Sequence, residues 1–359
     1  MNSIERMRAA INLEVPDRVP VAPLVWYHSA MLAGKTARDY RENVKTHLMC
    51  AERAYKEYDY DLICLFANPE IVNLVSPRPI RCHQCYNNEA CRIAILPDPL
   101  LKDWKEAKDF MQRGAMEYFN LKKAFLKPLA KWVKDAVRLY PRFVKKWHNR
   151  GVPVEAGGTA LGVDFTAMLR GLDNFFIDLK KHPNDLMELM EYVNTVTKEF
   201  AVRSVKLMGK GCHTEIGCWI GSPTFMSPRD FDKFILPFLE DTCDAAKKAG
   251  ATVIAHLDGD YTRTIHKLAG IDSIDVLQLE YTDLVKAKKA VGNRKCISGG
   301  LHPSHLVLHS PKQVLKEAGA LVRKCGKNGG FILGSACEVP MNAKPENIKA
   351  LIKASKDYS

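Results

Sequence analysis

Residues 252–260 read TVIAHLDGD, an apolar run that ends abruptly in polar residues and glycine. The first four residues are typical of a buried strand, because continuous apolar and β-branched side chains suit a sheet that is covered on both faces. His256 and Asp258 follow at the end of this run. Side chains two positions apart in a strand lie on the same face, so the imidazole and the carboxylate are predicted to point together.

The same pattern of strand-length apolar runs and amphipathic helical segments extends along the chain. Eight strands are predicted, at residues 18–26, 61–66, 152–159, 211–217, 252–258, 273–280, 295–300 and 330–336. Alternation of strands and helices favours an α/β fold, a (β/α)8 TIM barrel. A doubly wound open sheet is the alternative, but the first predicted strand is followed by no glycine fingerprint for dinucleotides.

A single domain over residues 1–359 is predicted, with an elaborated first half. Residues 78–100 contain prolines and are typical of a hairpin, and residues 103–150 have an almost continuous helical pattern. Together they form a predicted hairpin and helical insertion at residues 78–150. In a TIM barrel the functional side chains gather where the strands end, at the carboxyl face.

Composition favours a soluble, cytoplasmic protein that does not enter a membrane. Of the residues, 47% are hydrophobic and 26% are charged, and no stretch approaches the roughly 20 apolar residues of a membrane span. The formal net charge of +12 would attract acidic partners. Lysines are spread over helical segments without a nucleic-acid motif, so a solvated helix face and an acidic protein partner are both favoured over nucleic acid.

Eleven cysteines fit a reducing compartment, and most of them lie in apolar runs. Cys82, His83, Cys85 and Cys91 are the exception, because two thiols there have the spacing of a metal knuckle. A zinc knuckle needs a second pair of ligands with suitable spacing, and none follows closely. A polar hairpin is therefore favoured over a structural zinc site, and the role of this segment stays open.

Side chains of the kinds that bind metals lie at several predicted strand ends. They are His213 and Glu215 in residues 211–217, His256 and Asp258 in residues 252–258, Glu280 at the end of residues 273–280, and Cys337 directly after residues 330–336. Imidazole, carboxylate and thiolate groups that converge in a barrel mouth suit zinc. The predicted ligands are His256, Asp258, Glu280 and Cys337, although Asp258 would alternatively orient His256.

The remaining candidates are assigned to substrate and catalysis. Trp26, Tyr27, Phe66 and Trp219 follow or end predicted strands and would line an aromatic pocket, or else pack the barrel and its loops. His28, His213 and Glu215 are predicted to orient or protonate a substrate atom, and His256 is expected to be catalytic as well as a ligand.

Three segments carry a resemblance to a known family: ERMRAAINLEVPDRVPVAP (5–23), HLDGD (256–260) and GGFILGSACEVPMNAKPENIKALI (329–352). They resemble the uroporphyrinogen decarboxylase superfamily, and more closely its cobalamin-dependent methyltransferase branch. The resemblance implies a (β/α)8 barrel, in agreement with the strand pattern. The decarboxylases carry an Arg-Gln-Ala-Gly-Arg segment that grips porphyrin carboxylates. Here that place reads WYHSAMLAGKTARDY, which argues against porphyrinogen decarboxylation.

In the coenzyme M methyltransferases of this superfamily, zinc is held by a His-x-Cys pair and a later Cys, and a Glu can complete the set. The resemblance implies that His256 and Asp258 take the place of the pair, with Glu280 and Cys337 as the other ligands. A carboxylate in place of a thiolate makes the metal a better Lewis acid for oxygen and a poorer activator of a thiol. The pattern is similar to methyltransferase I of anaerobic O-demethylase systems.

That resemblance implies transfer of a methyl group from a methoxylated aromatic donor to cobalt(I) of a separate corrinoid protein. The sequence contains no recognisable cobalamin-binding domain, so the cobalamin would be carried by that partner. Two alternatives stay open: transfer from methylcobalamin to a small thiol or folate acceptor, and a non-catalytic corrinoid or tetrapyrrole carrier. The identity of the methyl donor and the oligomeric state cannot be predicted from the sequence.

Overall fold

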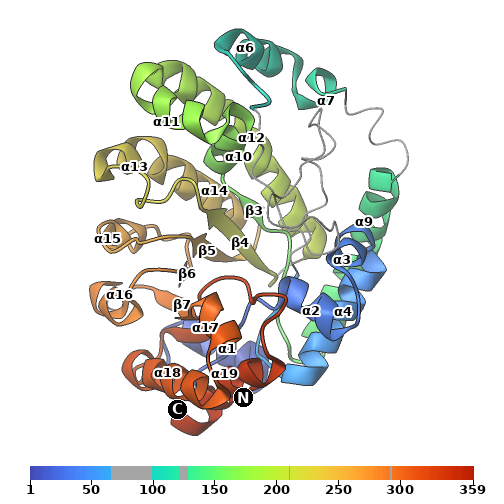
Figure 1. Cartoon of the computed structure of the whole chain (residues 1–359), viewed down its shortest axis with the longest axis vertical. Coiled ribbons are helices and arrows are strands. Elements are labelled where there is room, and N and C mark those ends of the chain that lie inside the picture. Colours follow the sequence, from blue (N-terminus) through green and yellow to red (C-terminus); the bar gives the residue numbers. More distant parts are fainter. Residues whose placement is uncertain (66–98, 121–127, 210, 292) are drawn as a thin grey trace.

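A computed structural model describes residues 1–65, 99–120, 128–209, 211–291 and 293–359 of the chain. Its centre is a curled sheet of parallel strands (Figure 1). In sheet order these are β1 (Ile63–Cys64), β2 (Val154–Glu155), β4 (His213–Cys218), β5 (Thr252–Leu257), β6 (Val276–Leu279), β7 (Cys296–Leu301) and β8 (Phe331–Ser335). A short strand, β3 (Thr159–Ala160), also pairs with β4.

Helices follow most strands and cover the outside of the sheet, as Figure 1 shows for α10 to α19. The first half contains α1 (Ser3–Ile11), α2 (Trp26–Leu32), α3 (Ala37–Glu42), α4 (Val44–Tyr58), α6 (Trp104–Arg113), α7 (Ala115–Tyr118) and α9 (Pro128–His148). The second half contains α10 (Gly162–Arg170), α11 (Leu172–Lys181), α12 (Pro183–Met208), α13 (Pro228–Phe234), α14 (Leu236–Lys248), α15 (Ile265–Leu268), α16 (Leu284–Val291), α17 (Pro303–Leu308), α18 (Pro311–Leu321), η1 (Val322–Gly326) and α19 (Pro345–Tyr358). Among the described residues, no helix combines the length and the apolar character that crossing a membrane requires.

The prediction of a regular first strand at residues 18–26 is wrong. This segment makes only two single parallel bridges, Val21 with Leu333 and Leu24 with Glu338. Pro20 and Pro23 have no backbone N–H to donate, so they interrupt a continuous ladder. The segment nevertheless lies between the two edge strands, because its backbone bonds β8 on one side and Asp61, just before β1, on the other.

The α/β class and the parallel sheet with helices between its strands are confirmed. The helical pattern at residues 103–150 corresponds to α6, α7 and α9. Most of the hairpin predicted at residues 78–100, including Cys82, Cys85 and Cys91, lies outside the described residues.

A buried ion cluster fixes the N-terminal segment to the start of β1. The carboxylate of Asp61, 1% exposed, accepts hydrogen bonds from Arg6 Nη1 and Arg18 Nη1, each at 2.7 Å, and from the backbone N–H of Val21 at 2.8 Å. Two guanidinium groups and one backbone donor satisfy this buried charge, which a single partner would leave incompletely compensated. The cluster therefore holds residues 18–21 beside the sheet.

Replacing Asp61 by alanine is expected to lower the free energy of unfolding by about 3 kcal/mol, because Arg6 and Arg18 would keep their charges without the buried partner. Urea unfolding followed by circular dichroism measures this change. The matched control is Asp17→Ala, which removes a more exposed carboxylate that also binds Arg6 and is expected to cost about 1 kcal/mol or less. Equal losses in the two variants would contradict the proposed importance of the buried carboxylate.

Candidate metal-binding active site

Three side chains meet at the carboxyl end of the sheet. His256 is the fifth residue of β5, Asp258 directly follows that strand, and Cys337 lies two residues beyond β8. His256 Nε2 lies 3.1 Å from Asp258 Oδ1, and Cys337 Sγ lies 3.6 Å from His256 Nε2 and 3.7 Å from Asp258 Oδ1. The ring of His256 is buried, whereas Asp258 and Cys337 are partly exposed. His256 and Cys337 are 81 positions apart in the sequence, yet their ligand atoms and that of Asp258 lie around one point.

The spacing of these three atoms suits a zinc ion. Tetrahedral bonds of 2.0–2.1 Å to nitrogen and oxygen and 2.3 Å to sulfur imply ligand–ligand distances of about 3.3 to 3.6 Å. The observed 3.1, 3.6 and 3.7 Å are close to these values. The set also combines the imidazole, carboxylate and thiolate groups found in zinc sites. A fourth position would remain for another ligand or a substrate atom.

A glutamine on the neighbouring strand orients the histidine. His256 Nδ1 lies 2.9 Å from Gln278 Oε1, and the two residues are direct register partners in β5 and β6. Because the amide oxygen accepts a hydrogen bond, it favours the tautomer with the proton on Nδ1. Nε2 then faces Asp258 and Cys337, and it would offer its lone pair to a metal ion that displaces its proton. This is the usual arrangement of a metal-binding histidine and its supporting hydrogen bond.

A tight turn after β5 places Asp258 and Glu280 side by side. Gly259 has a φ of +97°, and a Cβ atom there would collide with Ser222 and lie 2.6 Å from Thr224 Oγ1. Its backbone N–H donates to Glu280 Oε2 at 3.3 Å, and the carboxyl groups of Asp258 and Glu280 interact with each other directly. Glu280 thus contacts Asp258 but lies outside the three-residue set that meets at one point.

The charges at the site are strongly coupled. Burial lowers the pKa of His256, but the negative charges of Glu215 and Asp258 outweigh burial and hold it well above its ordinary value. Burial raises the pKa of Asp258, but the charge of His256 outweighs it and the net pKa is lowered. Burial and the nearby Asp258 raise the pKa of Glu280 to about 7. Two carboxylates and one thiol around one imidazole give an environment that favours a cation.

A second layer of polar groups lies beneath this site, inside the curled sheet. Glu155 on β2 is buried, and burial and the neighbouring Glu215 raise its pKa to about 8. Cys64 Sγ lies 3.7 Å from Glu155 Oε2. Glu215 is in register with Ile254 and so lies two residues deeper than His256 on the same face. Glu215 therefore supplies negative charge to the imidazole from inside the sheet, whereas the raised pKa of Glu155 keeps that carboxyl group largely protonated at neutral pH.

One predicted site residue, His213, lies elsewhere than expected. His213 begins β4 and pairs with Thr252, the first residue of β5, whereas His256 pairs with Gly217. At about 3.3 Å per residue, four steps separate His213 from the level of His256 by about 13 Å, so the prediction of a strand-end position for His213 is wrong. The strand runs in the direction that places Cys218, not His213, at its carboxyl end.

The structure places most of the residues predicted to bind substrate on α2 and directly after β4. Trp26, Tyr27 and His28 begin α2 and are buried. His28 Nε2 lies 2.7 Å from the hydroxyl of Tyr58. Trp219 directly follows β4 and is half-buried, with its backbone N–H 3.3 Å from Asp164 Oδ1. Phe66 lies outside the described residues. Their predicted role in substrate binding remains a prediction.

Three supporting residues were not identified from the sequence, namely Gln278, Glu155 and Asp164. Asp164 is buried and accepts hydrogen bonds from the backbone of Trp219, Ile220 and Gly221, which fixes the loop after β4. Gln278 and Glu155 interrupt apolar strand runs, and a polar residue inside such a run is the signal that could have revealed them. Burial raises the pKa of Asp164 to about 7, even though the three backbone donors act in the opposite direction.

Comparisons with known proteins agree with this architecture. The sequence profile of the family described as Uroporphyrinogen decarboxylase (URO-D) matches residues 117–358. The chain belongs to this family. The uroporphyrinogen decarboxylase of Chlorobaculum parvum is 23% identical over 237 residues, which cover 64% of this chain and 65% of that protein. That of Carboxydothermus hydrogenoformans is 27% identical over 143 residues, 39% of each chain. The alignments thus span less than two thirds of these relatives' own length.

A solved structure described as a methyltransferase from Methanosarcina mazei has the same fold. Its TM-score is 0.74 and its sequence identity 17%, and the superposition covers 100% of this chain and 99% of that one. The resemblance to the uroporphyrinogen decarboxylase superfamily is confirmed, and the fold is one that a methyltransferase also uses.

The zinc set is tested by two substitutions and a neighbouring control. We expect the purified protein to bind zinc, and Asp258→Asn and Cys337→Ala each to weaken binding at least about tenfold, because each removes one of three converging ligands. Competition with a chromogenic chelator measures the affinity. Asp260→Asn, two residues from Asp258 and exposed, should bind zinc as the unsubstituted protein does. Unchanged affinity in Cys337→Ala would exclude the thiolate as a ligand.

Gln278 should affect zinc binding without contacting the ion. Gln278→Leu is expected to weaken zinc affinity about 10- to 100-fold, since the imidazole of His256 would lose the acceptor that fixes its tautomer. Gln278→Glu keeps an acceptor at the same place and should restore most of the affinity. If the leucine variant bound zinc as tightly as the glutamate variant, the orienting role of Gln278 would be disproved.

Proposed function

We propose that the protein is a methyltransferase that moves a methyl group from a methoxylated aromatic donor to the cobalt(I) of a separate corrinoid protein. The observation that carries this proposal is the convergence of His256, Asp258 and Cys337 at the carboxyl end of the sheet. It is supported by the fold shared with a methyltransferase from Methanosarcina mazei. We also propose that the chain forms a single closed (β/α)8 barrel domain. Residues 20–24 lie between β8 and β1 and would close the barrel at that point.

Porphyrinogen decarboxylation, the activity named for the matched relatives, is the less favoured function. The segment corresponding to the arginines that grip porphyrin carboxylates reads WYHSAMLAGKTARDY here. It forms α2 and α3 in the structure, and its first three residues are buried against other side chains. It precedes residues 117–358, the part that matches the family profile. Without paired arginines, a substrate with several carboxylates would lose its main partners.

In the proposed reaction the bond between the methyl carbon and oxygen breaks and a bond between that carbon and cobalt forms. Cobalt(I) supplies the electron pair of the new bond, and the oxygen leaves with the pair of the old bond and then takes a proton. A zinc ion held by His256, Asp258 and Cys337 would supply Lewis acidity toward the leaving oxygen. One thiolate rather than two in the set favours an oxygen leaving group over activation of a thiol acceptor.

Neighbouring residues hold the metal ligands in place. Gln278 fixes the ring of His256, and Gly259 places Asp258 in the turn after β5. We assign Glu215 to the support of His256 from below through its charge, rather than to contact with the donor. His213 has no part in the proposed reaction, because it lies at the other end of β4.

We propose that a protein partner docks on the loops that follow β4 and β6. Tyr281 follows Glu280 directly and is 59% exposed, and Phe225, in the loop after β4, is 61% exposed. Exposed aromatic side chains are typical of interaction surfaces. The formal net charge of +12 would favour an acidic corrinoid protein. The methyl acceptor would thus reach the site from the face where the strands end.

The direct test mixes the purified protein, a corrinoid protein reduced to cobalt(I) and a panel of methoxylated arenes, and follows methylcobalamin formation by absorption spectroscopy. We expect transfer with at least one donor, and a loss of about 100-fold or more in Asp258→Asn and Cys337→Ala, with Asp260→Asn unaffected. Formation of methylcobalamin at equal rates with and without the protein would refute the proposal.

The same assay with different starting mixtures distinguishes the alternatives. If a methylated corrinoid protein loses its methyl group to an added thiol or folate, the protein catalyses methyl transfer in the opposite direction. If the corrinoid binds in a 1:1 complex without turnover in either direction, the protein is a carrier. Either outcome would contradict the proposed methyl donor while leaving the fold and the metal set intact.

A further inference from the structure

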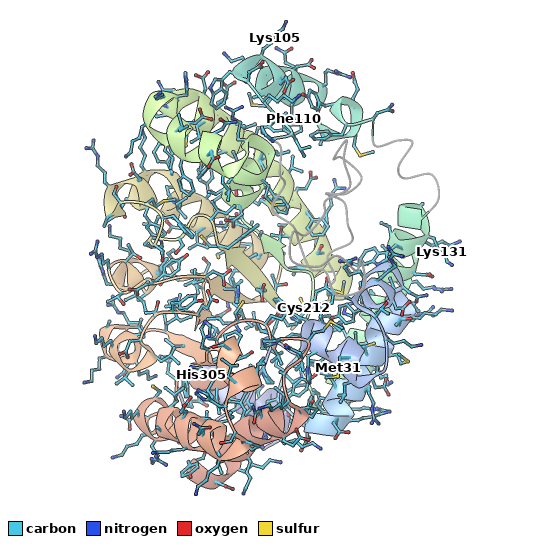
Figure 2. The ribbon with its side chains drawn as sticks, in the orientation of Figure 1. Met31, Lys105, Phe110, Lys131, Cys212 and His305 are labelled. Atoms are coloured by element: carbon cyan, nitrogen blue, oxygen red, sulfur yellow. The ribbon has the colours of Figure 1, made fainter. Side chains whose placement is uncertain are left out.

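A second group of metal-binding side chains lies on the helices that follow β7. It consists of His305 on α17, His309 at the C-terminal end of α17, and Glu317 on α18, and we call it the α17–α18 cluster. Figure 2 labels His305 on α17, next to α18 in Figure 1. None of the three belongs to the His256 site, and all are partly exposed.

The carboxylate of Glu317 faces both imidazoles. Glu317 Oε2 lies 3.0 Å from His305 Nδ1, and Glu317 Oε1 lies 3.1 Å from His309 Nδ1. The two rings stack, with their centroids 4.1 Å apart and an angle of 22° between their planes. One ligand atom from each residue thus lies within 4.8 Å of the other two. Two imidazoles and one carboxylate match the His₂Glu set of zinc enzymes.

One ring nitrogen in this cluster lies at ion-pair distance from the carboxylate but makes no hydrogen bond. His309 Nδ1 is buried and has no hydrogen-bond partner among the described residues, although Glu317 Oε1 is only 3.1 Å away. A short distance without hydrogen-bond alignment leaves a buried polar atom that costs free energy. Bonds to a shared ion would satisfy both atoms, since tetrahedral zinc separates nitrogen and oxygen ligands by about 3.3 Å.

The backbone that carries the cluster is held firmly. The side-chain amide of the buried Asn347, on α19, donates to the carbonyl oxygens of Leu306 and His309, each at 3.0 Å. Ser310 and Gln313 form a capping box that begins α18 directly after His309. The fold therefore fixes the backbone that carries these side chains, and rotation of the side chains alone is needed for metal binding. A fixed backbone favours binding because less conformational entropy is lost.

We propose that His305, His309 and Glu317 bind a divalent transition-metal ion, separately from the His256 site. Imidazole and carboxylate ligands suit Zn²⁺, Ni²⁺ or Cu²⁺ rather than Ca²⁺ or Mg²⁺. At least one position on the ion stays open to water, because the cluster supplies three ligands. One of the stacked rings turns to direct its Nδ1 lone pair at the ion. The bound ion cross-links α17 to α18.

The location gives this ion a structural connection to the candidate active site. α17 follows β7 directly, and its N-cap residue is His302. His302 Nε2 lies 2.9 Å from the hydroxyl of Tyr281, which follows Glu280. The cross-link would thus steady the helix that contacts the loop after β6. This proposal does not depend on methyl transfer, and the ion takes no part in the reaction proposed above.

The test uses the variant Asp258→Asn/Cys337→Ala as background, so that the His256 site does not contribute. Calorimetric titration with Zn²⁺ is expected to show one remaining site. Adding His305→Ala, His309→Ala or Glu317→Gln should weaken that site at least about tenfold. The control is His266→Ala, which removes an exposed histidine on α15 and should leave the binding unchanged.

A second readout excludes loss of structure as the cause. With Cu²⁺ as probe, the background variant should show electron paramagnetic resonance couplings to two imidazole nitrogens, and His305→Ala should show one. Circular dichroism and the thermal midpoint without added metal should be the same in all variants. Absence of Zn²⁺ binding in the background variant would overturn the proposal, as would equal weakening by His266→Ala, which would indicate adventitious surface binding only.

Discussion

Parallel strands that end at one edge of a curled sheet bring together residues that are far apart in the sequence. His256 and Asp258 come from the end of β5, and Cys337 comes from the segment after β8, yet their ligand atoms lie 3.1 to 3.7 Å apart. This contact depends on the register of β5 to β8, in which each strand aligns with the next without interruption. The turn at Gly259 and the hydrogen bond that His256 donates to Gln278 support this meeting point.

The interior of the sheet is less apolar than a core usually is, and its polar groups are arranged below the site. Glu155, Glu215 and His256 interact electrostatically in a space where an isolated charge would be costly. A buried carboxyl group with a raised pKa, such as that of Glu155, near an imidazole is more typical of a functional site than of packing. The N-terminal ion cluster around Asp61 is structural rather than functional. Two arginines and a backbone N–H donate hydrogen bonds to the buried carboxylate, and the cluster anchors the N-terminal segment.

Much of the fold and the centre of the site were predictable from the sequence. The apolar run before His256 and the two-residue spacing to Asp258 indicate one strand face, and the structure places both side chains together. Cys337 could be added because it follows another predicted strand. The regular first strand could not be predicted correctly, since Pro20 and Pro23 allow isolated bridges but not a ladder. His213 was assigned to the wrong end because a short apolar run does not reveal where its strand begins. Gln278 and Glu155 act through neighbours on other strands, and only the register between strands reveals such contacts.

The central claim is that one thiolate, one imidazole and one carboxylate from two distant segments bind a single zinc ion. X-ray absorption spectroscopy at the zinc edge tests this directly, on protein loaded with one equivalent of zinc and compared with the Cys337→Ser variant. Both proteins carry His305→Ala, which removes a ligand of the second proposed metal site. The account predicts one sulfur neighbour at about 2.3 Å together with nitrogen and oxygen neighbours at about 2.0 to 2.1 Å, with the sulfur signal lost in Cys337→Ser. A spectrum without a sulfur neighbour, or with the same sulfur signal in both proteins, would contradict it.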